Sequence, residues 1–233
     1  MVERLLNLHG YGPSLLEGTW LTIQISLLSL ALAGALGIIT ALAKISAFAP
    51  AKAVATVYTT VIRGIPDLLL MLIIFFGGQK LVNWGAPKLG YTDYIDVNPF
   101  VAGVITIGFI FGAYMGETFR GAILAVPKGQ LDAGRAFGMR PGQVFWRILF
   151  PQMVRHAIPG FGNNWLVLLK TTALVSVVGL QDLVYKAGVA GRSVREPFTF
   201  FFAVALIYLV LTTISILALQ WAEKRYSVGF EAR

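Results

Sequence analysis

Cysteine is absent from this chain of 233 residues, and Asp, Glu, Lys and Arg together make up only 13% of it. Without cysteine there can be no disulfide, no thiolate metal site and no cysteine nucleophile. The charged fraction is about half of that in a typical soluble domain, which argues against a soluble globular protein. Walker A, H-E-x-x-H and G-x-S-x-G motifs are also absent, so the sequence has no recognisable machinery for hydrolysing ATP or a peptide.

Apolar residues make up 57% of the chain and gather in long runs, which reach the roughly 20 residues that a helix needs to cross a bilayer. The sequence therefore predicts an all-α polytopic membrane protein with a single transmembrane domain. The second of its spans is interrupted by RGIPD, and the fourth contains Lys170. Five spans are expected, at about 15–43, 54–80, 97–119, 159–182 and 197–222.

Basic residues set the expected orientation, because loops rich in Lys and Arg tend to stay in the cytoplasm. Five spans place the termini on opposite sides of the membrane, and the loops on the C-terminal side hold more basic residues. That larger set is Lys44, Lys52, Arg120, Lys128, Arg135, Arg140, Arg147, Arg155, Lys224, Arg225 and Arg233, against Arg4, Lys80, Lys88, Lys186, Arg192 and Arg195. We therefore expect the N-terminus outside and the C-terminus in the cytoplasm.

The basic loop between the third and fourth spans contains GQLDAGRAFGMRPGQVFWRILFP at 129–151. Its pattern predicts a short helix over 130–138 that ends at a left-handed Gly138. A second helix should begin at Pro141, a favoured first position, and be interrupted by Pro151. The product would be two short helices at an angle to each other, lying at the cytoplasmic surface.

Two interpretations of this segment follow from the residues alone. One is an amphipathic hairpin held at the membrane surface by anionic lipid. The other is a docking element for a soluble partner, in which the small residues Ala133, Gly134 and Ala136 allow close approach.

The spacing within the segment resembles the signature of the membrane subunits of ATP-binding-cassette importers, which is E-A-A, three residues, G, nine residues and I-x-L-P. The matching positions are Asp132, Ala133, Gly134, Gly138, Ile148 and Pro151. Asp132, Gly134 and Phe150 replace the usual Glu, Ala and Leu, while the spacing is complete. The resemblance implies a coupling segment seated in a cleft of a separate ATPase subunit, which would explain the missing Walker A motif.

The likeness extends over about 12–230 and is to the polar amino acid branch of this family. The stretches that carry it are TTVIRGIPDLLLMLIIFFGGQ, GAYMGETFRGAILAVPKGQLDAGRAFG, FGNNWLVLLKTTALVSVVGLQDL and EKRYSVG. The sequence most resembles the Q-type permease subunits of histidine/lysine/arginine/ornithine importers. This implies the type I importer permease fold, a place in the bacterial inner membrane, and a pathway for polar, cationic amino acids.

The resemblance also implies partners: a second permease subunit, identical or different, two ATPase subunits that use the ATP, and an extracytoplasmic amino acid binding protein. The chain itself is expected to contact membrane lipid, to bind no cofactor, metal or nucleic acid, and to catalyse no covalent step. The rival hypothesis is a self-sufficient ion-coupled carrier or small channel. It needs acidic groups in the membrane, for which Asp67 and Glu117 are the candidates.

Ionisable residues at membrane depth cost several kcal/mol unless they face a cavity or a partner, so each is a candidate site. Arg63 and Asp67 flank the break at 64–66, where an interrupted helix suits a zwitterionic substrate. Arg63 is suited to hold the substrate carboxylate with two hydrogen bonds. In the alternative interpretation Asp67 caps the restarted helix and pairs with Arg63. Glu117 and Arg120, three residues apart, predict an ion pair, with a place in the pathway as the alternative.

The fourth span carries a polar arc, because Asn163, Asn164, Lys170 and Thr171 fall within about a third of the helix circumference. Such an arc should face the bundle interior, the pathway or a subunit interface. The two asparagines are candidates for substrate contact or for hydrogen bonds between helices. Lys170 is a candidate for a gate or a structural ion pair.

Overall fold

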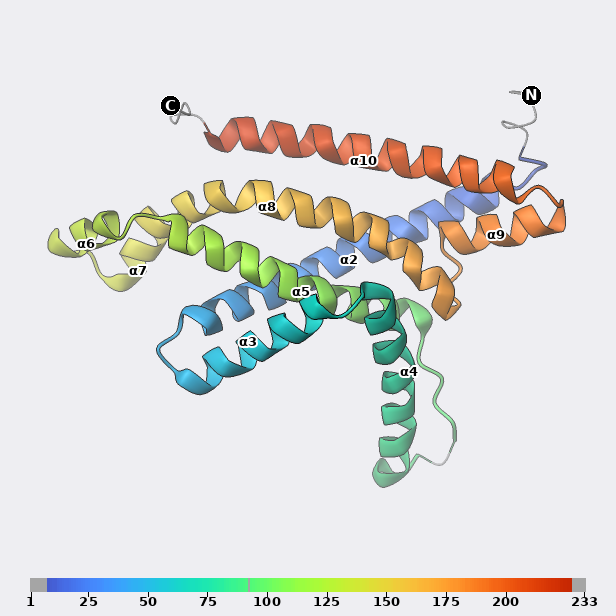
Figure 1. Ribbon diagram of the computed structural model, residues 1–233, viewed down its shortest axis with the longest axis horizontal. Helices are drawn as coiled ribbons and strands as arrows, with labels where there is room; N and C mark the ends of the chain where they lie inside the picture. Colours follow the sequence, from blue (N-terminus) through green and yellow to red (C-terminus); the bar gives the residue numbers. More distant parts are fainter. Residues whose placement is uncertain (1–7, 92, 228–233) are drawn as a thin grey trace.

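Residues 8–91 and 93–227 are described by a computed structural model, and their regular structure is entirely helical (Figure 1). Five helical stretches are long and apolar enough to cross a membrane, which confirms the predicted all-α membrane fold. Arg4, Arg233 and the expected domain limit at residue 230 lie outside the described residues. The five stretches are Gly12–Ile45, Asp67–Leu89, Pro99–Ala125, Pro141–Val178 and Pro197–Tyr226.

The first and third spans, α2 (Gly12–Ile45) and α5 (Pro99–Ala125), pack closely and run in the same direction. Three glycines at intervals of four residues on α5 face α2. Each of them contacts the α2 residue that lies 76 positions earlier in the sequence. A Cβ on Gly112 would lie only 2.8 Å from the Leu36 Cβ. Glycine lets the two backbones approach, and the repeated offset fixes their register. The three pairs are Gly108–Leu32, Gly112–Leu36 and Gly116–Thr40.

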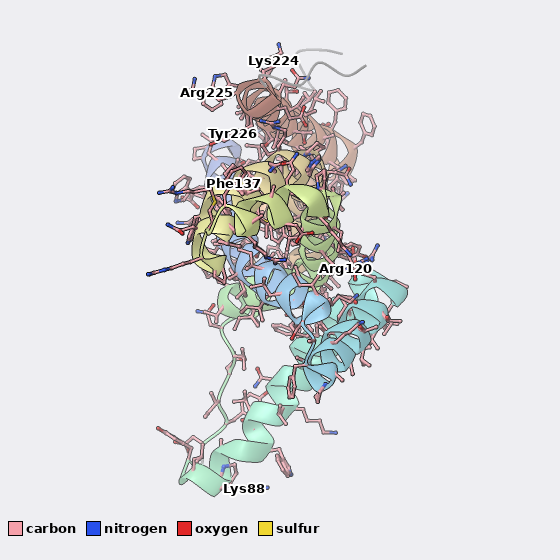
Figure 2. All side chains as sticks on the ribbon, turned by 90° about the vertical axis from the view of Figure 1, so that its left-hand side faces the viewer. Lys88, Arg120, Phe137, Lys224, Arg225 and Tyr226 are labelled. Atoms are coloured by element: carbon pink, nitrogen blue, oxygen red, sulfur yellow. The ribbon has the colours of Figure 1, made fainter. Side chains whose placement is uncertain are left out.

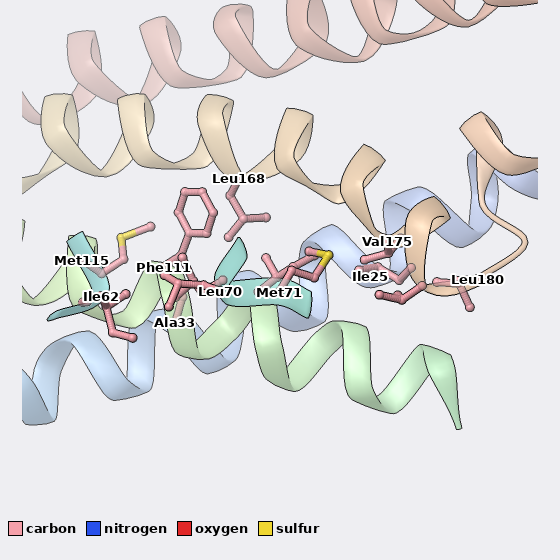
Figure 3. Close-up of a cluster of buried hydrophobic side chains, with 14 residues drawn as sticks. Ile25, Ala33, Ile62, Leu70, Met71, Phe111, Met115, Leu168, Val175 and Leu180 are labelled. Carbon is pink, nitrogen blue, oxygen red and sulfur yellow. The ribbon is translucent and has the colours of Figure 1, made fainter. Parts of the chain in front are cut away.

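The largest cluster of buried apolar side chains lies where this helix pair meets α8 (Phe150–Thr171) and the start of α4 (Asp67–Gly85), as Figure 3 shows. Phe111 of α5 and Leu168 of α8 occupy the space between those two helices. Both are almost completely buried. α5 is therefore enclosed between α2 and α8, and it provides a fixed frame for the polar residues at its C-terminal end.

The second predicted span differs from the structure. Two helices occupy this region, α3 (Ala49–Gly64) and α4 (Asp67–Gly85). With 16 residues α3 is too short to cross a bilayer, and it packs beside α2 and α5. Ile65 is extended because the following Pro66 disfavours helical backbone at that position. The chain then turns, α4 leads away from the bundle (Figure 1), and the second candidate span begins at Asp67 rather than at about 54.

A second correction concerns Pro151, which does not interrupt its helix. The N–H of Phe150 bonds the carbonyl of Phe145, five residues back, and this wide turn leads directly into α8. Pro151 then lies in the first turn of α8, where a proline is tolerated. The elements of this region are α6 (Lys128–Ala136), α7 (Pro141–Val144), the π-helical turn η2 (Phe145–Leu149), α8, and the 3-10 turn η3 (Thr172–Val178).

Two further helices complete the chain, α9 (Leu183–Ser193) and α10 (Pro197–Ser227), and a short 3-10 turn η1 (Ala86–Leu89) follows α4. In Figure 1, α6, α7, the α2–α3 turn and the C-terminal end of α10 lie at one end of the molecule, while α9 lies at the other. The fold thus gathers at one end the basic loops that the sequence assigns to the cytoplasm.

Candidate functional site

A polar cavity of about 460 Å³ lies between α2, α3 and α5. It forms because α3 stops at the proline break and leaves its last turn facing the C-terminal half of α5. The register of the two parallel helices brings Lys44 of α2 level with Arg120 of α5. The cavity is lined by Lys44, Thr59, Thr60, Arg63, Gly64, Tyr114, Glu117 and Arg120.

Glu117 accepts hydrogen bonds from two cations in this cavity. Arg120 Nε lies 2.9 Å from Glu117 Oε2, so the predicted ion pair is present. Lys44 Nζ donates to Glu117 Oε1, and also to Thr59 Oγ1 at 2.7 Å. The Glu117 side chain is only 17% exposed. In such shelter the loss of one partner strands a charge, so this cluster holds α2, α3 and α5 together.

Arg63 and Asp67 do not form the direct ion pair that the alternative interpretation expects, and Tyr114 lies between them instead. The Arg63 guanidinium carbon lies 5.6 Å from the centre of the Tyr114 ring, and Tyr114 Oη donates to Asp67 Oδ1 at 3.5 Å. Asp67 also makes no side-chain cap, because Pro66 occupies the cap position and Asp67 is the first residue of α4. The helix dipole favours its negative charge there.

The polar arc on α8 does not form one site. Asn164 Nδ2 donates to Thr118 Oγ1 of α5 at 2.9 Å, which is the hydrogen bond between helices that the sequence offers as the alternative. Asn163 lies outside the polar cavity and lines a separate space between α8 and α10. Thr171 bonds the carbonyl of Val167 within its own helix.

Lys170 is exposed on α8, and the described residues give it no ion pair. The structural ion pair expected for it is therefore not found within this part of the chain. A lysine about three quarters of the way along a candidate span is unfavourable toward lipid.

The predicted coupling segment has the expected helix and turn. α6 is followed by Gly138 at φ +78°, the left-handed backbone that the sequence predicts and that glycine adopts without strain. Arg135 Nη1 and Asp132 Oδ1 form an ion pair at 3.0 Å on the outer surface of α6. Ala133 is exposed on the same helix.

Gly134 is turned inward, and the expectation that it faces a partner is wrong. A Cβ at this position would lie 2.5 Å from Ile148 Cδ1, so glycine lets α6 pack against η2. Gly134 and Ile148, two of the signature positions, thereby hold the segment together from inside. Its exposed apolar surface comes instead from Phe137, which is 88% exposed, and Trp146, which is 64% exposed. Figure 2 shows Phe137 at the end of the molecule that faces the viewer.

Four residues of the cavity wall were not singled out from the sequence, namely Lys44, Thr59, Thr60 and Tyr114. From the sequence, Lys44 was counted only among the cytoplasmic loop charges. The glycines of α5 and the small residues of α2 nevertheless indicate how these two helices pack, and this packing brings Lys44 beside Glu117. For Tyr114 the sequence offers a weaker signal, a phenol within an apolar run.

Residues 33–228 match the family described as "Binding-protein-dependent transport system inner membrane component". The chain is 51% identical over 222 residues to the histidine/lysine/arginine/ornithine transport system permease protein HisQ of Salmonella typhimurium, covering 95% of this chain and 97% of that protein. It is 38% identical over 229 residues to the octopine transport system permease protein OccQ of Rhizobium meliloti, covering 96% and 97%. A crystal structure of an amino acid ABC transporter with histidines matches with a TM-score of 0.81 at 31% identity, covering 95% of this chain and 98% of that one.

Proposed function

We propose that the cavity between α2, α3 and α5 holds a cationic amino acid during transport. The chain belongs to the family of binding-protein-dependent transport system inner membrane components, and it is a permease subunit of an ABC importer for amino acids. The chain is a transport subunit, not an enzyme. Its relatives, named as permeases of transport systems, do not favour the rival of a self-sufficient carrier. The name of HisQ supports histidine, lysine, arginine or ornithine as the substrate class.

The observation that carries this proposal is that a guanidinium and a carboxylate lie on either side of a helix break, with the Tyr114 ring between them. Arg63 lines the cavity, and Asp67 is reached from it through Tyr114. A basic amino acid carries one carboxylate and two cationic groups. Arg63 would hold the carboxylate, while Asp67 and the face of the Tyr114 ring would attract a cationic group.

Glu117 has a different role in this proposal, because its charge is already balanced by Lys44 and Arg120. By joining α2 to α5, it would hold the pathway closed at the level of the C-terminal ends of these two helices. Asn164 would keep α8 in register with α5 through Thr118. Asn163 and Lys170 would face the pathway or the second permease subunit, since their side chains are exposed within a candidate span.

The segment 129–151 would couple this pathway to a separate ATPase, which uses the ATP. Its matching positions keep α6 and η2 in one rigid unit, and Phe137 and Trp146 extend from that unit as apolar anchors. The complete importer would contain a second permease subunit, two ATPase subunits and an extracytoplasmic amino acid binding protein. In this arrangement α6 and the C-terminus lie in the cytoplasm and the N-terminus lies outside.

Uptake of radiolabelled arginine by the reconstituted importer tests the site. Replacing Arg63 with Ala removes a charge-assisted hydrogen bond and should raise KM about tenfold. Lys88→Ala is the matched control, because Lys88 Nζ lies 3.4 Å over the Trp84 ring at the far end of α4, away from the cavity. Equal KM values for Arg63→Ala and the unmodified importer would remove Arg63 from the substrate site.

A further inference from the structure

The loop between α4 and α5 carries negative charge in a protein that is basic as a whole. Residues 89–98 contain two acidic residues, Asp93 and Asp96, and no basic one, although the chain has a net charge of +8. Both side chains are exposed, and no described residue forms an ion pair with either of them. Glu17 and Glu196, which the predicted orientation also assigns to the outer side, lie 2.6 and 3.6 Å from a basic side chain. The loop therefore presents two uncompensated negative charges.

Two amide side chains of α4 hold the backbone of this loop in place. Gln79 donates to the Ile95 carbonyl at 2.6 Å and accepts from the Val97 N–H at 2.8 Å. Asn83, one turn later on α4, donates to the same carbonyl at 2.8 Å and accepts from the Ile95 N–H at 2.9 Å. Asp96 lies between the two clamped residues, so its charge is carried on a fixed backbone. A partner that binds here does not have to order this part of the loop, which lowers the cost of association.

Two tyrosines beside the carboxylates add a surface for apolar contact. Tyr91 is 62% exposed and Tyr94 is 72% exposed. The end of α4 and the chain that follows it stand clear of the other helices in Figure 1, and Figure 2 shows Lys88 at that end of α4. Exposed tyrosines are enriched where proteins bind one another, but they also occur in aromatic belts at membrane surfaces. The acidic residues favour a protein partner, because anionic lipid headgroups repel carboxylates.

We propose that this loop is a docking surface for the extracytoplasmic amino acid binding protein of the importer, which would bring basic side chains to it. The residues of the surface are Tyr91, Asp93, Tyr94 and Asp96. The inference rests on the proposed function, which supplies the binding protein and assigns the loop to the outside, and the family of this chain is binding-protein-dependent. A second copy of the chain fits less well, because a contact between two copies of the loop would oppose like charges.

Surface plasmon resonance tests the docking, with the purified binding protein, loaded with arginine, and the complete importer in nanodiscs. Asp93→Asn and Asp96→Asn should each raise Kd about threefold, as for an exposed ion pair, and the double variant about tenfold. High salt should remove most of this difference, because it screens exposed charges. Glu17→Gln is the matched control, since it removes an exposed carboxylate that Lys186 already pairs with at 2.6 Å.

Gln79→Leu keeps every charge of the loop but removes two bonds of the clamp, so it should also weaken docking. Tyr94→Cys supplies the only thiol of this chain, and a crosslinker attached there should capture the binding protein. The proposal is overturned if the aspartate variants or Gln79→Leu dock with unmodified affinity, or if Glu17→Gln weakens docking equally. Crosslinking of position 94 to the second permease subunit or to lipid alone would also overturn it. If the unmodified importer does not bind the binding protein at all, the proposed function itself fails, and this inference fails with it.

Discussion

The third and fifth spans are both strongly apolar, yet they have opposite surroundings. In the most apolar window of α5, 61% of residues are buried within the chain, against 11% in the corresponding window of α10. The difference lies in side-chain size. α5 carries glycines at positions 108, 112 and 116 against α2, whereas the α10 sequence from Pro197 to Tyr226 contains no glycine. Small residues thus mark where this chain packs on itself, and large ones mark faces left for lipid or another subunit.

The largest effect is expected from overpacking the contact between α2 and α5, which tests whether the glycines of α5 are needed there. Gly112→Leu would drive a side chain into Leu36 and the Tyr58 hydroxyl, both 2.8 Å from the position of a Cβ. We expect a loss of about 3 kcal/mol or more, enough to prevent recovery of folded protein. Gly121→Leu is the control on the same helix, because nothing lies within 4 Å of its Cβ position. Size-exclusion chromatography of both variants provides the measurement, and normal recovery of Gly112→Leu would contradict the packing assigned to α5.

Two carboxylates that form ion pairs, Glu117 in the cavity and Asp132 on the surface of α6, allow a comparison of sheltered and open surfaces. Glu117→Gln should destabilise the protein by about 2 kcal/mol, because it strands Lys44 and Arg120 in a sheltered cavity. Asp132→Asn breaks a pair whose side chains are both 66% exposed and should leave stability unchanged. Thermal unfolding of the purified variants followed by circular dichroism compares them. Equal losses of stability would show that the cavity does not shelter Glu117.

Asp182, the N-cap residue of α9, is a sheltered carboxylate near the N-terminal end of α2, whereas Glu117 lies near the C-terminal end of that helix. It lies outside the candidate spans, is completely buried, and accepts from the Tyr185 N–H. Burial raises its pKa to about 6, because the charged form loses its hydration. Since the folded pKa lies above the unfolded one, the folded state binds the proton more tightly, and stability falls as pH rises from about 4 through 6.

We expect the unmodified protein to lose about 1 to 2 kcal/mol between pH 5 and pH 8 through this group. Asp182→Asn keeps a good helix cap but cannot ionise, so its stability should vary less over the same interval. Unfolding temperatures measured across this pH series distinguish the two proteins. Parallel curves would show that Asp182 is already ionised in the folded state at pH 5, which would contradict the raised pKa.

The smallest effect on stability is expected where the coupling segment packs on itself. Gly134→Leu would push α6 away from Ile148, and we expect weaker association with the ATPase while the membrane bundle stays folded. Gly142→Leu lies in the same segment with nothing within 4 Å of its Cβ position, and serves as the control. Co-purification of a tagged ATPase measures the difference. Full recovery of the ATPase with Gly134→Leu would show that the packing of this segment is not needed for docking.

Hydropathy predicted the number and order of the spans, because a helix formed by a long apolar run is stable in the hydrocarbon core of a bilayer and not in water. It placed the second span wrongly, since α3 is a short helix that the Pro66 break separates from α4. It also began the fourth span at about 159, whereas the candidate span begins at Pro141. It also treated Pro151 as an interruption. A π-helical turn rearranges the backbone hydrogen bonds there, and no residue pattern in the segment announces that turn.

The candidate site was only partly predictable. Glu117 and Arg120 are neighbours on one helix turn, so local spacing was enough to pair them. Lys44 joins them through the parallel register of two helices, which requires reading the glycine spacing as a packing signal. The polar arc of α8 failed for a related reason: α8 has neighbours on several sides, and Asn163 and Asn164 face different ones.

The central claim is that the cavity between α2, α3 and α5 holds the transported amino acid. Because the chain has no cysteine, a single Thr60→Cys provides a unique reporter in the cavity wall, and Thr56→Cys provides a control one helix turn away. The rate of labelling by a charged thiosulfonate reagent is measured on the assembled importer with and without arginine. We predict that arginine slows labelling at position 60 and not at position 56. Equal rates at position 60 in the presence and absence of arginine would contradict the account.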